Sequence, residues 1–242
     1  MKKILALLAF ALLAPSLRAA EEPPLDHAPV NLADKSSLQH GAAIFINNCL
    51  NCHTASMMRY QRLIDLGLTD EQIKQNLLFT TAKVGDTMAA PVDPKIAKAA
   101  FGIVPPDLSL IARSRSPDWL YTYLRSFYRD PKSKTGWNNE VFPNVAMPHV
   151  LWQQQGEQAL QVTERKDEIT GNTIETRRLV LERPGSLTPI EYDRYVGDLV
   201  NYLVFMSEPA QRRSEWGQGS RRADGPRTPQ RLPSAAVTTW PS

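Results

Sequence analysis

The chain has 242 residues, and 42% of them are hydrophobic, which is typical of a folded domain and excludes a chain that is disordered throughout. The net charge of +3 is unevenly spread: residues 1–20 carry +3 and residues 211–242 carry +4, so residues 21–210 carry −4. A mildly acidic central part argues against a nucleic-acid-binding protein and fits a basic protein partner.

The first 20 residues predict a secretory signal peptide that is cleaved from the mature protein. Lys2 and Lys3 form a charged start, an apolar run covers residues 4–13, and Ala19-Ala20 offers a small-residue cleavage site. An apolar run this short is disfavoured as a membrane anchor, because the hydrocarbon core of a bilayer is about 30 Å thick. We therefore expect the mature protein outside the cytoplasm.

Residues 21–35 resemble an irregular lead-in, and residues 36–51 predict a helix with one apolar stripe. This helix runs into Cys49-Leu50-Asn51-Cys52-His53, which has the C-x-x-C-H spacing of a c-type haem attachment site. Two thiols three positions apart on a helical turn can reach the two vinyl groups on one porphyrin edge. His53 lies on the same face as Cys49, four positions later, and can bind the iron. The motif predicts one covalently attached haem.

Three other interpretations of the two cysteines are weaker. A structural zinc site needs four ligands, and the chain has no second cysteine pair. A thioredoxin-like redox pair would lie in a βαβ context, which the neighbouring sequence lacks. A plain disulfide between Cys49 and Cys52 is the remaining alternative.

The next predicted elements are a helix capped by Asp70, a mostly irregular segment over residues 80–106 that is rich in proline and small residues, and a helix over residues 119–128. The Ser-Pro-Asp sequence at 116–118 begins the last of these. It combines a capping hydroxyl, a proline in the first position and an acid in the first turn. The helix is rich in aromatic residues, so we expect one side of it to be buried.

The sixth ligand of the iron decides which chemistry a haem performs. A methionine raises the potential and suits electron transfer, whereas an open position suits gas binding or peroxide chemistry. Met147 is the favoured candidate, because the prolines around it stiffen its loop. Met88, in another proline-flanked loop, and His149, which would give a bis-histidine site, are the rivals. Spacing alone leaves this choice open, since a lone methionine is usually part of a core.

The last elements are a β-hairpin and a helix. Residues 159–163 and 173–181 alternate in polarity and flank Thr170-Gly171-Asn172, a typical turn sequence. An amphipathic helix is predicted over residues 188–208. Beyond it, residues 211–242 are polar and basic, and we expect this tail to be disordered.

Several segments, in chain order over roughly residues 30–210, resemble the cytochrome c1 family, the haem subunits of ubiquinol–cytochrome c reductase. The haem motif alone occurs in any c-type cytochrome, but its ordered combination with the other segments is far more specific. These other segments are His40-Gly41, Arg59-Tyr60, Pro105-Pro106-Asp107-Leu108-Ser109, Ile111-Ala112-Arg113-Ser114-Arg115, Tyr121-Thr122-Tyr123-Leu124, Phe142-Pro143-Asn144-Val145-Ala146-Met147-Pro148 and Asp198-Leu199-Val200-Asn201-Tyr202-Leu203 before Glu208-Pro209.

The resemblance implies a mostly α-helical, cytochrome c-like fold enlarged by insertions, to which the predicted small β-hairpin would belong. It also implies a ligand set for one haem c. Cys49 and Cys52 would attach the cofactor covalently, and His53 and Met147 would be the two metal ligands.

The resemblance implies further contacts with the haem. Pro106 would pack on it, and Arg115 would approach a propionate, where a guanidinium makes a charge-assisted contact. For Arg113 and Arg115 a solvated helix face is the alternative. Tyr121 and Tyr123 are candidates for a contact with the other propionate, or for the aromatic core.

The implied function is the transfer of single electrons from the Rieske iron–sulfur protein to a soluble cytochrome c, beside cytochrome b and on the periplasmic side of the bacterial inner membrane. Such a subunit is not catalytic on its own. A free periplasmic electron-shuttle cytochrome is the runner-up. A haem enzyme or sensor with an open sixth position and a non-haem protein with bridged cysteines are the other classes.

The sequence departs from the family at its end. The family continues after the Glu-Pro segment into a transmembrane helix, whereas residues 211–242 contain no apolar span. We therefore expect a signal peptide over residues 1–20, a haem domain over residues 21–210 and a tail over residues 211–242. Membrane association would then depend on the complex. We hypothesise that the tail is an out-of-frame reading of a region that encoded the anchor.

Overall fold

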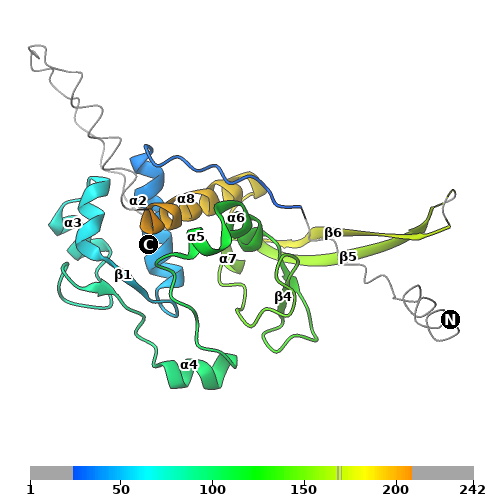
Figure 1. Cartoon of the computed structure of the whole chain (residues 1–242), viewed down its shortest axis with the longest axis horizontal. Coiled ribbons are helices and arrows are strands. Elements are labelled where there is room, and N and C mark those ends of the chain that lie inside the picture. The colour runs from blue at the N-terminus through cyan, green and yellow to red at the C-terminus, as the bar shows by residue number, and fades with distance from the viewer. Residues whose placement is uncertain (1–23, 168, 170, 209–242) are drawn as a thin grey trace, which may run out of the picture. The chain divides into compact units, whose positions relative to one another are not determined.

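The computed structural model of the protein describes residues 24–167, 169 and 171–208. These residues form a mostly helical fold with three two-stranded antiparallel sheets, so the predicted fold class and the predicted β-hairpin are confirmed (Figure 1). The expected signal peptide and the expected tail lie outside the described residues. Within the described part of the chain, no helix has the length and apolar character needed to cross a membrane.

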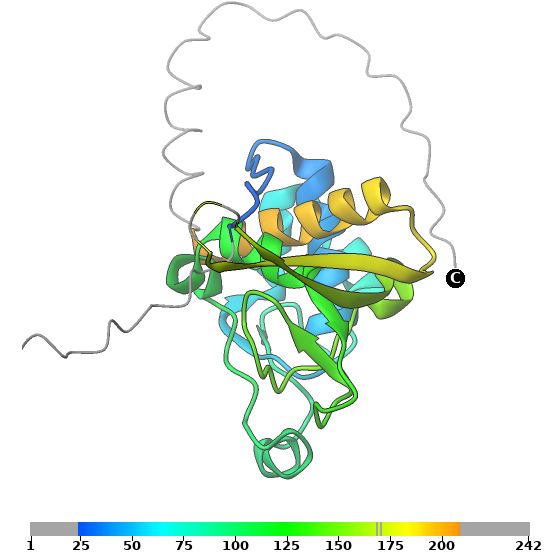
Figure 2. The same ribbon diagram turned by 90° about the vertical axis from the view of Figure 1, so that its right-hand side faces the viewer.

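Two helices from opposite ends of the sequence pack against each other in the core. They are α2 (Lys35–Ile44) and α8 (Pro189–Ser207), which lie side by side in Figures 1 and 2. Gly41 is at their contact, where an added Cβ would collide with the backbone carbonyl of Asp198. The close approach of the two helices therefore requires glycine at this position. The buried residues of α8 include Tyr192, Val196, Leu199, Val200, Leu203 and Val204, so this helix presents an apolar face to the core.

The predicted helix over residues 36–51 exists in two parts. α2 continues directly into a π-helical turn, η1 (Phe45–Cys49), which delivers the haem motif. A short strand, a 3-10 helix and an α-helix follow. They are β1 (Ala55–Arg59), η2 (Tyr60–Leu66) and α3 (Asp70–Asn76).

The cap of α3 is Thr69 and not the predicted Asp70. The Thr69 hydroxyl accepts from the Gln72 amide at 3.2 Å, and the Gln72 side chain accepts from the Thr69 amide at 2.8 Å. This reciprocal pair satisfies two amides that have no partner within the helix, which places the cap one residue earlier.

The segment over residues 80–106 is mostly irregular, as predicted, but it contains a helix that the sequence pattern did not indicate. After β2 (Thr87–Met88), which pairs with β1, the segment forms α4 (Pro94–Phe101). Asp93 caps this helix by accepting from the Lys95 amide at 2.7 Å, and Pro94 occupies the first position. The proline that suggested a loop therefore begins a helix, where its missing N–H costs nothing.

The central region carries α5 (Ile111–Arg115), α6 (Pro117–Arg125), β3 (Phe127–Arg129), β4 (Trp137–Asn139) and α7 (Trp152–Gln155). The Ser116 hydroxyl accepts from the Trp119 amide at 3.2 Å, so the predicted cap of α6 exists. The helix ends three residues before the predicted Tyr128, because the chain turns at Ser126 and pairs with β4.

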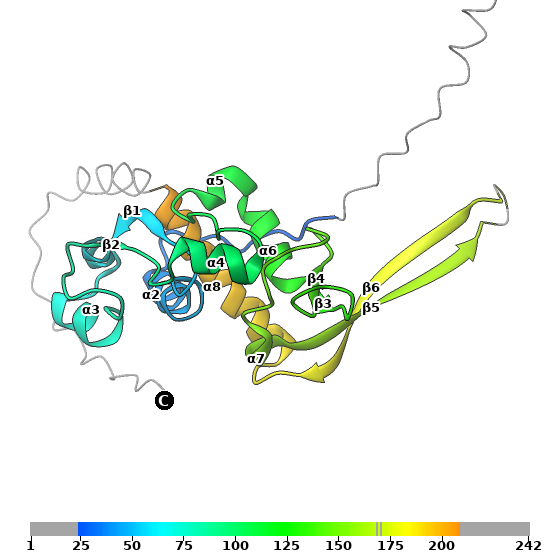
Figure 3. The ribbon, with the colours of Figure 1, turned by 90° about the horizontal axis from the view of Figure 1, so that it is seen from below.

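The hairpin is longer than the sequence pattern indicated. Its strands are β5 (Gly156–Lys166) and β6 (Thr173–Pro184), paired from end to end. Figure 3 shows it projecting from the helical part of the molecule. Its distal half is exposed on both faces, which explains why apolar alternation marked only part of each strand.

Candidate functional site

The C-x-x-C-H sequence forms a tight turn at the end of η1. The Cys49 carbonyl accepts hydrogen bonds from the amides of Cys52, at 3.1 Å, and His53, at 2.9 Å. Both cysteines are free thiols. Burial, with a smaller contribution from Cys52, raises the pKa of the Cys49 thiol to about 12. The Cys49 thiol is therefore protonated at neutral pH in the unliganded protein.

His53 is held by the backbone of a distant segment. Its Nδ1 lies 2.8 Å from the carbonyl oxygen of Pro106. Because a carbonyl oxygen only accepts, Nδ1 carries the proton and Nε2 keeps its lone pair for a metal. Burial lowers the pKa of His53, partly opposed by the Pro106 carbonyl and by Asp107. Burial thus favours the neutral ring that a metal requires.

The segment 105–109 is fastened beside His53 by its own polar side chains. The two carboxylate oxygens of Asp107 accept from the amides of Ser56, at 2.9 Å, and Ser109, at 2.8 Å. The Ser109 hydroxyl accepts from the Met57 amide at 3.0 Å. These bonds fix the position of the Pro106 carbonyl, and with it the orientation of the His53 ring.

Met147 lies on the loop between β4 and α7 and is partly buried against the core. The Tyr123 hydroxyl donates to its Sδ at 3.4 Å. Met88 instead is fully buried, and its strand β2 pairs with β1, immediately after His53. Met88 therefore belongs to the core beside the chain that follows His53, whereas Met147 lies on a separate, partly exposed loop.

The His149 side chain belongs to an aromatic cluster in the core. Its ring is stacked on Phe127, with centroids 4.9 Å apart, and meets the Trp137 ring edge-on at 5.1 Å. It is 2% exposed, and burial lowers its pKa to about 4, against a smaller opposing effect of Gln155. Two aromatic rings thus hold this histidine in place, while its buried Nε2 has no hydrogen-bond partner among the described residues.

Arg115 stacks on aromatic rings near Met147. Its guanidinium carbon lies 5.0 Å from the centroid of Trp119 and 5.6 Å from that of Phe142. Trp119 is in turn stacked on Tyr123 at 4.7 Å. The structure therefore links Arg115 to Met147 through two stacked rings, while the residue itself is exposed on the surface.

The loop that carries Met147 is braced by a buried amide that the sequence patterns did not indicate. The Oδ1 of Asn139 accepts from the amides of Val141, at 2.9 Å, and Phe142, at 3.0 Å. Its Nδ2 donates to the backbone carbonyl of Tyr123 at 2.8 Å. Asparagine has no periodicity or spacing rule that marks such a brace. The stacking of Trp119 on Tyr123, four positions apart on α6, did have a sequence signal.

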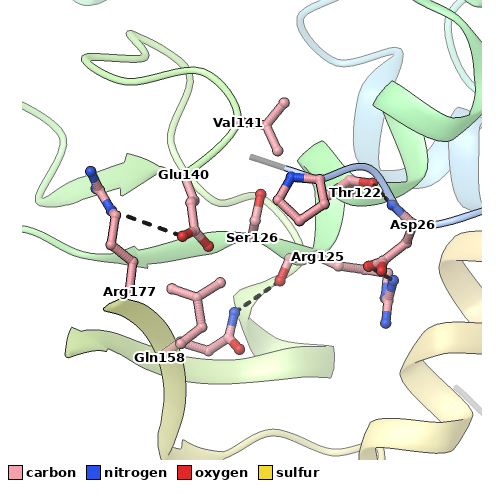
Figure 4. Close-up of a pocket in the computed structure, with 10 residues that line it drawn as sticks. Asp26, Thr122, Arg125, Ser126, Glu140, Val141, Gln158 and Arg177 are labelled. Atoms are coloured by element: carbon pink, nitrogen blue, oxygen red, sulfur yellow. Dashed lines mark hydrogen bonds and ion pairs between the residues drawn. The ribbon is translucent and has the colours of Figure 1, made fainter. Parts of the chain in front are cut away.

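A polar pocket of about 360 Å³ lies elsewhere, between α6 and the base of the hairpin (Figure 4). Charges in it are already paired: Arg125 donates to Asp26 at 2.6 Å, and Arg177 lies 3.9 Å from Glu140. No predicted haem residue lines this pocket, so it is separate from the candidate site.

Comparison with known proteins identifies the family of this chain. The model of the Cytochrome C1 family matches residues 26–170. The chain belongs to the cytochrome c1 family. It is 46% identical over 215 residues to "Cytochrome c1" of Allochromatium vinosum, covering 87% of this chain and 86% of that protein. It is 48% identical over 211 residues to "Ammonia monooxygenase gamma subunit" of Nitrosomonas europaea, covering 86% of this chain and 85% of that protein.

The relationship extends to plant mitochondria. A "Cytochrome c1-2, heme protein, mitochondrial" of Solanum tuberosum is 31% identical over 155 residues, which are 53% of this chain and 59% of that protein. Membership of the cytochrome c1 family implies a c-type haem and the role of an electron carrier in a bc1-type complex.

Proposed function

We propose that this chain holds one haem c, attached through Cys49 and Cys52, with His53 and Met147 as axial ligands, and that it carries single electrons. The observation that carries the proposal is the His53 ring, fixed by the Pro106 carbonyl at 2.8 Å beside a turn that contains two free thiols. When bound, the haem iron supplies reversible one-electron chemistry. Everything else is supplied by the residues of this chain.

These residues have distinct tasks in the proposed site. His53 presents a neutral Nε2, and the thioether of Met147 favours the ferrous state and so raises the potential. Pro106 orients the histidine from behind and packs on the haem. Arg115 approaches a propionate while its guanidinium stays stacked on Trp119. We propose residues 21–210 as the haem domain that contains this machinery, after a signal peptide over residues 1–20 and before a tail over residues 211–242.

The proposed electron path runs from a Rieske iron–sulfur protein, through this chain, to a soluble cytochrome c, with cytochrome b as the third subunit. The proposed location is the periplasmic side of the inner membrane. The charge of −4 over residues 21–210 supports a basic acceptor, because opposite charges speed the encounter of electron-transfer partners. In this path the chain is a carrier and not a catalyst on its own.

The name of the Nitrosomonas relative motivates a second candidate, an electron-transfer subunit of an ammonia-oxidising enzyme. Co-purification from native membranes separates the candidates. Recovery of a cytochrome b and a Rieske protein supports the bc1-type assignment, and recovery of a monooxygenase supports the second candidate. Recovery of the chain alone, after mild detergent, would indicate a free electron shuttle.

The covalent haem is tested by a haem-dependent peroxidase stain on a denaturing gel. The parent protein should keep the stain after boiling, and the double variant Cys49→Ala, Cys52→Ala should lose it. Asn51→Ala, an exposed residue between the two cysteines, is the matched control and should keep it. An unchanged stain in the double variant would refute the attachment.

A further inference from the structure

Among the residues that the structure describes, two methionine sulfurs accept a hydrogen bond from a tyrosine. Tyr123 donates to Met147 Sδ at 3.4 Å, and Tyr202 donates to Met88 Sδ at 3.5 Å. The chemistry is the same, but the surroundings differ. Met88 is fully buried, whereas Met147 is partly exposed on the loop between β4 and α7. Only the first pair involves the proposed iron ligand.

The Tyr123 ring is held rigidly from several directions. It is stacked on Trp119 with centroids 4.7 Å apart and an interplanar angle of 11°, and it meets Phe127 at 5.0 Å and 65°. Its backbone carbonyl accepts from the buried Asn139 side chain at 2.8 Å. Only 8% of Tyr123 is exposed, so the ring has no room to swing away. The hydroxyl is therefore a donor in a fixed place.

A thioether sulfur has two lone pairs, and an axial ligand uses one of them for the metal. A hydrogen bond to the other lone pair restricts rotation about the side-chain bonds of the methionine, and so it fixes the direction of the first lone pair. It also withdraws electron density from the sulfur, which makes the sulfur a weaker donor. The oxidised iron carries the larger positive charge and loses more from a weaker donor, so the reduced state is favoured.

We propose that Tyr123 is a positioning residue for Met147: its hydroxyl occupies one lone pair of Sδ, directs the other toward the iron and raises the reduction potential. This inference rests on the proposed function, because it takes Met147 as the axial ligand. Tyr123 would then influence the reduction potential without being a ligand of the iron.

The test uses the full-length haem-loaded protein and compares Tyr123→Phe with Tyr202→Phe. Both variants keep the aromatic ring and remove one hydroxyl from a methionine sulfur. Tyr123→Phe should lower the reduction potential, so that the ratio of reduced to oxidised protein at a fixed applied potential falls about fivefold. This change corresponds to a shift of about 40 mV for a one-electron couple. The methionine–iron charge-transfer band of the oxidised protein should shift with it. Tyr202→Phe should change neither quantity.

A fluorinated tyrosine at position 123 gives an independent measurement. It keeps the hydroxyl and the ring but is a stronger donor, so it should move the potential upward. If phenylalanine lowers the reduction potential and fluorotyrosine raises it, the hydrogen bond is the cause, since a packing defect would not shift the potential in opposite directions.

The outcomes separate this inference from the proposed ligand set. If Met147→Leu changes the spectrum but neither change at position 123 moves the potential, the role of Tyr123 is refuted while Met147 remains the ligand. If Met147→Leu leaves the spectrum and the potential unchanged, the proposed ligand itself is wrong. A shift on Tyr202→Phe alone would overturn both, and would assign the ligand to Met88.

Discussion

The two proposed axial ligands are held by different kinds of contact. His53 belongs to a turn closed by the Cys49 carbonyl, and the Pro106 carbonyl fixes its ring. Met147 lies on a loop whose shape depends on the Asn139 side chain and whose sulfur contacts Tyr123. Backbone carbonyls contact the histidine directly and side chains act only behind them, whereas side chains contact the methionine and its loop directly. We infer that the methionine side is the easier side to open by substitution.

The sharpest way to test this contrast is to remove the methionine ligand. Met147→Leu keeps the apolar volume but loses the sulfur, so the potential should fall, and the reduced protein should then bind carbon monoxide. Spectroscopic titration measures both effects. Met88→Leu, in the fully buried core, is the matched control and should leave the potential unchanged. An unaffected potential in Met147→Leu would mean that another residue binds the iron.

A smaller effect is expected from the brace of the methionine loop. Asn139→Ala leaves the amides of Val141 and Phe142 without their side-chain acceptor and removes one of the donors to the Tyr123 carbonyl. Since each orphaned group costs about 1–3 kcal/mol, we expect a loss of about 3 kcal/mol, or roughly 6–12 °C in Tm for a domain of this size.

Carbon monoxide binding distinguishes a local from a general effect of the brace. It should rise in Asn139→Ala because the loop no longer holds Met147. Asn47→Ala, in which an exposed helix side chain loses one bond to a carbonyl, serves as the control and should change neither quantity appreciably. A stable Asn139→Ala variant with an unaltered sixth position would contradict the proposed dependence on side chains.

The smallest effect concerns the histidine side. Burial alone would raise the pKa of Asp107, but hydrogen bonds from Ser109 and Ser56 outweigh it and lower the pKa. A carboxyl whose pKa is depressed by folding stabilises the folded protein at neutral pH. This stabilisation is lost as the pH falls from the ordinary carboxyl range through the lower folded pKa.

Asp107→Asn should therefore destabilise the protein at pH 7 and have little effect at strongly acidic pH. Because Asp107 is exposed and screened by solvent, we expect less than about 1 kcal/mol. Thermal unfolding over a pH series measures the difference. Glu182→Gln, a charge removal on an exposed hairpin position, controls for the loss of charge. A difference between parent and Asp107→Asn that grows on acidification would refute the assignment.

A helix could be predicted where its start is marked by residues close together in the sequence. Ser116 caps α6 as expected, because a capping hydroxyl acts on an amide three residues away. The same kind of signal failed for α4, where proline and small residues resembled a loop although Asp93 and Pro94 begin a helix. The predicted strands of the hairpin were shorter than β5 and β6. The exposed outer parts of these strands have no buried face, and so their apolar and polar residues do not alternate.

The C-x-x-C-H turn is formed by residues adjacent in the chain, and so its predicted chemistry could be read from spacing alone, whereas the contact of His53 with the distant Pro106 carbonyl could not. Met147, Met88 and His149 could not be separated in this way, because spacing does not show what a side chain packs against. The tertiary structure gives them different surroundings: Met88 is beside the chain that follows His53, His149 is stacked on Phe127, and Met147 is within reach of Tyr123. Contacts between residues 22 or more positions apart depend on how helices and loops pack, and that packing is a property of the whole core.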